Sequence, residues 1–143
     1  SDLPRCAHDR HTASLARMRR AAKVLLGLAL VGAGISHLTV ARREFQAQVP
    51  AALPLDPDTV VVWSGVAEIA LGSALALAPA RAERTVGTVA AAFFTAIFPG
   101  NVEQFADGRD GFGLDTDGKR FGRLFFQPVL VAWALWSTHG PRR

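Results

Sequence analysis

Four long stretches carry almost no charged residue, and they limit the fold more than any other feature of the sequence. They are residues 24–41, 59–80, 85–102 and 124–138, in which Glu68 is the one charged side chain. A membrane-spanning helix needs about 20 largely apolar residues, with a range of about 17–25. Helices of a soluble bundle would instead carry a polar face along their length. We therefore predict an all-α fold, an integral membrane four-helix bundle.

The expected helices cover about residues 20–40, 59–79, 84–106 and 121–138, and together they form one membrane domain over 20–138. The fourth reaches full length only with Arg123 at the membrane surface. Pro99 predicts a kink in the third helix and Pro128 an interruption in the fourth. A basic tail, residues 1–19, should precede the bundle, polar and mobile over its first 16 residues, and residues 139–143 should follow it. A cleavable secretory signal would also explain the first segment, but its length and the further membrane segments favour a retained helix.

The distribution of basic residues predicts the orientation, because cytoplasmic segments collect Lys and Arg. Of the 16 Lys and Arg residues, ten lie in the tail, between the second and third helices, or after the fourth, and six lie on the other side. Eight of the 12 Asp and Glu residues lie on that other side. Both termini should therefore face the cytoplasm of a bacterial inner membrane, with loops 41–58 and 107–120 outside. The pI near 10.5 then reflects topology and contact with anionic lipid. We expect the lipid bilayer, and not nucleic acid, as the partner.

Each expected helix contains one strongly polar residue: His37, Glu68, Asn101 and Gln127. A charge near the bilayer centre costs at least ~2.5 kcal/mol, so such a residue usually faces protein or water. The residues four positions from Glu68 on either side are Ser64 and Gly72, and small residues let another helix approach closely. Glu68 should therefore face a partner helix.

The helix directions place these polar residues at similar depths, with Glu68 deepest. We predict that all four line one outward-opening cavity and are the candidates for ligand binding or proton carrying. Arg42, Arg43 and Arg123 are secondary candidates. The alternative is purely structural, because Asn101 and Gln127 could also satisfy backbone groups freed by the neighbouring prolines. No catalytic residue can be assigned.

Several chemistries are excluded by composition. The one cysteine, Cys6, rules out an intramolecular dithiol relay. His37 lacks a second intramembrane histidine for bis-histidine haem ligation, and no Gly-rich nucleotide loop is present. The acidic loop lacks the EF-hand spacing, so we expect a solvated turn and no metal site at Asp107, Asp110, Asp115 and Asp117.

The segments around the polar residues resemble the DoxX family of small four-helix bacterial membrane proteins. Residues 64–72 (SGVAEIALG) resemble its S-G-x-x-E-I-x-x-G helix, and residues 34–37 (GISH) resemble its G-x-x-H-F, with Leu38 in place of the Phe. Residues 98–101 (FPGN) resemble F-P-A-N. Residues 123–133 (RLFFQPVLVAW) resemble R-L-P-x-Q-x-x-L-x-x-W, with Phe125 in place of the Pro.

The resemblance covers about residues 20–138 and implies the fold and the membrane setting. The family takes its name from a subunit of a thiosulfate–quinone oxidoreductase. Our first hypothesis is therefore an accessory subunit or small-molecule binder in membrane redox chemistry, with no independent activity, a quinone as the molecule in the pocket and an oxidoreductase subunit as partner. The second is a proton-coupled small-molecule transporter centred on Glu68. The third is a structural subunit of a larger complex. A homo-oligomer is compatible with each.

Overall fold

The chain is helical throughout the part that the structure describes. The computed structural model describes residues 3–40, 42–109 and 116–141, which contain no strand. Its helices are α1 (Leu3–Leu38), α2 (Arg42–Gln46), α3 (Pro57–Leu77), α4 (Glu83–Ala106), α5 (Asp117–Leu124) and α6 (Phe126–Thr138). Helices α1, α3 and α4 are long and apolar enough to cross a membrane. The all-α prediction is confirmed at this level.

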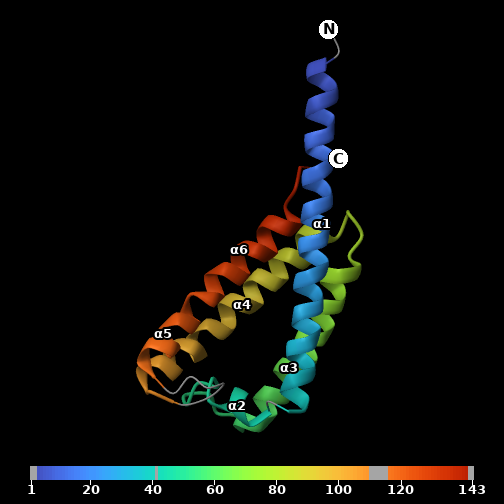
Figure 1. Cartoon of the computed structure of the whole chain (residues 1–143). Coiled ribbons are helices and arrows are strands. Elements are labelled where there is room, and N and C mark those ends of the chain that lie inside the picture. Colours follow the sequence, from blue (N-terminus) through green and yellow to red (C-terminus); the bar gives the residue numbers. More distant parts are fainter. Residues whose placement is uncertain (1–2, 41, 110–115, 142–143) are drawn as a thin grey trace.

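Helix α1 differs most from its expected bounds, because it begins at Leu3 and not near residue 20. No Gly or Pro occurs between Pro4 and Gly27, and Ala, Leu and Arg, which favour helix, are frequent there. The polar tail therefore continues the apolar helix without a break. Figure 1 shows this first part of α1 extending beyond the other helices.

The fourth apolar segment forms two helices, where the sequence predicts one interrupted helix. Helix α5 ends at Leu124, and α6, which contains Pro128, begins at Phe126. Proline has no N–H to donate to the carbonyl four residues earlier, which here belongs to Leu124. At the junction of the two helices, the Phe125 N–H donates to the carbonyl of Gly122 at 3.2 Å.

Helices α1 and α3 form a tightly packed pair through two sets of facing glycines. A Cβ atom built on Gly27 would lie 2.5 Å from the carbonyl oxygen of Gly72, and one on Gly34 would lie 2.6 Å from that of Gly65. Small residues at such positions let two helix backbones approach closely. Helices α4 and α6 pack similarly, with Gly87 directly against the Thr138 side chain.

The two pairs meet at one end and diverge toward the other (Figure 1). At the narrow end, near the C-terminus, Lys23 Nζ lies 2.8 Å from Glu83 Oε1 and donates to the carbonyl of Ala78 at 3.0 Å. Trp133 Nε1 donates to the carbonyl of Ala22 at 2.9 Å, which joins α6 to α1. The buried core between the pairs consists of Leu26, Leu30, Leu75, Ala90, Ala91, Phe94 and Ala134.

At the wide end the chain between α2 and α3 crosses the gap between the helix pairs. We call residues 47–55 the cover loop. It is tied to α4, because the Ala51 N–H donates to Glu103 Oε1 at 2.7 Å and Arg109 donates to the carbonyl of Val49 at 2.9 Å. The carbonyl of Gln48 packs directly on Gly100, where a Cβ atom would collide with it. A side chain at position 100 would therefore displace the cover loop.

Candidate ligand cavity

A cavity of about 650 Å³ lies between the two helix pairs, beneath the cover loop. Every helix except α2 and α5 contributes several residues to its wall, and α2 and α5 contribute Phe45 and Arg123. Most lining side chains are apolar. The polar ones are His37, Gln48, Ser64, Glu68, Arg123 and Gln127. A volume of this size and a mostly apolar wall with a few polar groups are typical of small-molecule sites.

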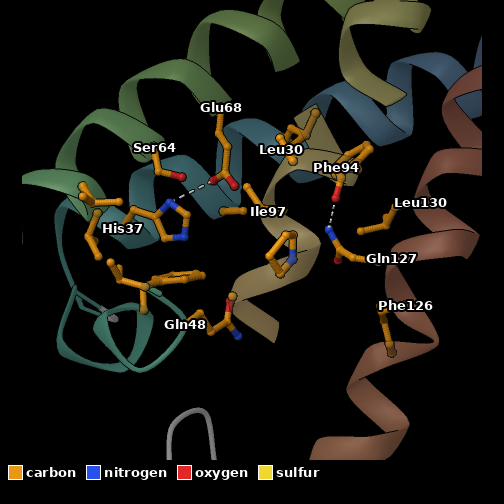
Figure 2. Close-up of a pocket in the computed structure, with 18 of the residues that line it drawn as sticks. Leu30, His37, Gln48, Ser64, Glu68, Phe94, Ile97, Phe126, Gln127 and Leu130 are labelled. Atoms are coloured by element: carbon orange, nitrogen blue, oxygen red, sulfur yellow. Dashed lines mark hydrogen bonds and ion pairs between the residues drawn. The ribbon is translucent and has the colours of Figure 1, made fainter. Parts of the chain in front are cut away.

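His37 and Glu68 form a buried pair on one side of the cavity. His37 Nδ1 lies 3.0 Å from Glu68 Oε2, and the two residues are 4 % and 5 % exposed. The α1–α3 glycine packing positions them, because Gly65 lies against the Cβ atom of His37. The other ring nitrogen, Nε2, is buried and has no hydrogen-bond partner among the described residues. Figure 2 shows the His37 ring beside the Glu68 carboxylate, with this nitrogen turned away from Glu68.

Gln127 and Arg123 form the opposite wall. Gln127 is 2 % exposed, and its amide nitrogen donates to the carbonyl of Phe94 at 2.8 Å (Figure 2). Arg123, one turn earlier and at the end of α5, donates to Gln127 Oε1 at 3.0 Å. Its guanidinium lies over the ring of Phe126 at 5.7 Å and interacts electrostatically with Glu68. The cavity is therefore bounded by an acceptor-rich side and a cationic side.

The remaining candidates lie elsewhere. Asn101 is 3 % exposed, but it is not a lining residue, and its amide nitrogen and oxygen have no partner in the described part of the chain. Arg42 and Arg43 belong to a shallow surface depression at α2. There Arg42 Nε donates to Asp58 at 2.6 Å. This hydrogen bond, together with the charge of Asp58, raises the pKa of Arg42 above its ordinary value.

The cover loop and α2 supply wall residues that the sequence analysis missed. The ring of Phe45 packs perpendicular to the ring of His37, and Gln48, Val49 and Leu53 line the cavity. The sequence signal was weak, because it consisted of apolar residues among the prolines of loop 41–58. Such residues indicate that one side of the loop packs against the rest of the protein.

The acidic turn gives no metal centre in the described residues, where no group of three or more His, Cys, Asp or Glu side chains is placed to hold a metal ion. Asp107 and Asp117 are exposed. Asp110 and Asp115 lie outside the described residues.

Comparison with known proteins assigns the chain to a family but not to an activity. A family model described as a domain of unknown function (DUF8561) matches residues 26–138. The chain therefore belongs to this family, and the match includes the four polar candidates and the glycine contacts described above. No curated protein and no solved structure shows significant similarity to it.

Proposed function

We propose that this member of the DUF8561 family is a four-helix membrane protein whose cavity binds a small lipophilic molecule with a polar head, of the quinone type. In this proposal it acts as an accessory component of membrane redox chemistry and has no independent activity. The redox setting rests on the sequence resemblance to the DoxX family. The binding function rests on the cavity.

The observation that carries the proposal is a mostly apolar cavity that has polar groups on two opposite walls. The His37–Glu68 pair occupies one wall and the Arg123–Gln127 pair the other, and the remaining lining is mostly apolar. An apolar tail would occupy the greater part of such a space, while a ring with two polar substituents would meet the two polar walls.

The proposed placement is the bacterial inner membrane with both termini in the cytoplasm. Helices α5 and α6 together would supply the fourth crossing, since the 13 residues of α6 are too few to span alone. Arg20, Lys23 and Arg84 lie near the narrow end, which would face the cytoplasm, whereas Glu103 and Asp107 lie near the wide end. This distribution agrees with the preference of Lys and Arg for the cytoplasmic side.

A substitution that fills the cavity tests the binding function. Ala33 lines the cavity, so Ala33→Phe would place a ring inside it, whereas Ala70→Phe adds the same ring at an exposed position of α3. We expect the wild-type protein in nanodiscs to bind a decyl-substituted benzoquinone saturably, Ala70→Phe to bind equally, and Ala33→Phe to lose at least tenfold in affinity. Absence of saturable binding to the wild type, or equal affinity for Ala33→Phe, would contradict the proposal.

A second candidate is proton-coupled transport, which the buried titratable pair His37–Glu68 at the cavity wall favours. The two functions differ in what happens on ligand addition. A transporter in sealed proteoliposomes would accumulate ligand when a proton gradient is imposed, and Glu68→Gln would abolish this uptake. A binding protein would show saturable binding without gradient-driven accumulation.

A further inference from the structure

The protonation of the His37–Glu68 pair determines what the free side of His37 offers to a ligand. Nδ1 and Oε2 lie 3.0 Å apart, within ion-pair distance. The nature of Nε2 depends on which ring nitrogen carries the proton, because the two nitrogens of a neutral imidazole are one donor and one acceptor. If Glu68 is ionised and His37 neutral, Nδ1 is the donor to Glu68 and Nε2 is a hydrogen-bond acceptor. If Glu68 is protonated, or if His37 is an imidazolium, Nε2 is a donor.

Charge balance in the cavity favours the first arrangement. Among the described residues, His37, Glu68 and Arg123 are the titratable groups that line the cavity. An ionised Glu68 with a neutral His37 and a charged Arg123 gives zero net charge, while both other arrangements give a net charge of +1. A net charge inside a mostly apolar cavity is unfavourable.

The dipole of α1 favours a protonated His37, but its effect is weaker than that of the net charge. His37 lies in the last turn of α1, where the helix dipole favours a positive charge. The effect of the helix dipole is smaller than the cost of a net charge inside the cavity. The balance of these effects therefore favours the arrangement in which His37 is neutral and carries its proton on Nδ1.

The wall that contains Arg123 requires a hydrogen-bond acceptor on the ligand. Arg123 is a donor only, and its bond to Gln127 occupies one of its five N–H groups. A ligand that satisfies both walls therefore presents a hydroxyl donor to His37 Nε2 and an oxygen acceptor to Arg123. A hydroquinone ring has both, while the corresponding quinone has acceptors alone.

Building on the proposed binding function, we infer that the cavity selects the reduced, hydroxyl-bearing head of its ligand over the oxidised, carbonyl-bearing head. Glu68 is then a positioning residue, which sets the tautomer of His37 without touching the ligand. The quinone would leave Nε2 facing a second acceptor, and an unmatched buried acceptor weakens binding. We expect about a tenfold preference for the hydroquinone.

The experiment compares three forms of one probe by titration calorimetry in nanodiscs under anaerobic conditions: decyl-hydroquinone, decyl-benzoquinone and the hydroquinone dimethyl ether. The wild type should bind the hydroquinone about tenfold tighter than either other form. In Glu68→Leu, where Nδ1 has lost its acceptor and either tautomer is free, the ratio should fall toward one. The matched control is Ser73→Ala, on the same helix, whose hydroxyl bonds the carbonyl of Ile69 and does not line the cavity. Its ratio should equal that of the wild type.

The outcomes distinguish failure of the predicted preference for the hydroquinone from failure of the binding function. Equal binding of hydroquinone and quinone by the wild type, or tighter binding of the quinone, would overturn the inference and leave the binding function intact. Failure of all three forms to bind would refute the binding function itself.

The tautomer of His37 can also be measured directly while Glu68 is present, so this test does not depend on the folding of Glu68→Leu. A variant with His8, His11 and His139 replaced by Gln leaves His37 as the only histidine. Nitrogen-15 NMR of the labelled imidazole then distinguishes the two tautomers and the imidazolium. A protonated Nδ1 with an unprotonated Nε2 supports the inference, and a protonated Nε2 overturns it.

Discussion

Replacing Gly72 with Ala should separate α1 from α3 and destabilise the protein. A Cβ atom at position 72 would lie 2.5 Å from the carbonyl oxygen of Gly27 and 2.8 Å from the backbone nitrogen of Val31. Ordinary van der Waals contact begins at about 3.4 Å, so the backbones would have to move apart by about 0.9 Å. Both close atoms belong to the backbone of α1, which cannot rotate away as a side chain would.

The magnitude follows from two opposing effects. Overpacking typically costs about 1–3 kcal/mol, and the wider spacing also loses dispersion contacts along the helix pair. Alanine favours helix over glycine by at most about 1 kcal/mol. We expect a net loss of about 1–2 kcal/mol in the free energy of unfolding.

Gly32→Ala is the matched control, because a Cβ atom at position 32 of α1 would meet no atom within 4 Å. The assay is unfolding of the detergent-solubilised protein by increasing sodium dodecyl sulfate, followed by circular dichroism. Gly32→Ala should unfold with the wild type or slightly later, and Gly72→Ala earlier. Because α1 and α3 also carry His37 and Glu68, Gly72→Ala should weaken binding of the hydroquinone probe as well. Coincident unfolding curves for the two variants would refute the glycine-packing explanation.

Three further predictions concern the topology and the two buried amides. In a background without the native cysteine, an impermeant thiol reagent should label Asp117→Cys in intact cells and Ala82→Cys only after permeabilisation; the reverse pattern would contradict the proposed orientation. Gln127→Leu should lower the free energy of unfolding by about 1–3 kcal/mol, because it removes two hydrogen bonds, one donated to the Phe94 carbonyl and one accepted from Arg123. Asn101→Leu removes an amide that has no partner among the described residues, so it should be neutral or stabilising in the same detergent assay; a loss equal to that of Gln127→Leu would show that Asn101 has a partner.

The positions of the long helices were predictable, because the hydropathy of a segment is a local property. The expected starts of α3 and α4 lie within two residues of Pro57 and Glu83. The start of α1 was not predictable from hydropathy, since the helix passes from an apolar to a polar sequence without a breaker. The division at Phe125 was only partly predictable: Pro128 indicated an interruption, but not whether the chain would bend or end one helix and begin another.

The site was less predictable, because polarity within a membrane segment indicates that a residue avoids lipid but not which group it meets. Glu68 with its small neighbours required a partner helix, yet several helices could have supplied one. The choice of α1 depends on the matching of Gly27 with Gly72, a tertiary property that neither helix shows alone. Asn101 and Gln127 had similar sequence settings, each within two residues of a proline. Only the packing distinguishes them, since Gln127 lines the cavity and reaches the Phe94 carbonyl, whereas Asn101 is not a lining residue.

The same packing explains why a cavity exists at all in so small a bundle. The glycines hold α1 and α3 in close contact between Gly27 and Gly34, and Gly87 with Thr138 holds α4 to α6. The helices of the two pairs are joined at the narrow end, where Lys23 and Trp133 make their bonds, and at the wide end the cover loop links them. Two pairs that diverge from one end leave space at the other, and filling it would require larger side chains than the small ones at positions such as Ala29 and Ala33. Buried polar groups at the wall of unfilled space are costly unless something satisfies them. A ligand that pairs with His37 Nε2 would relieve that cost.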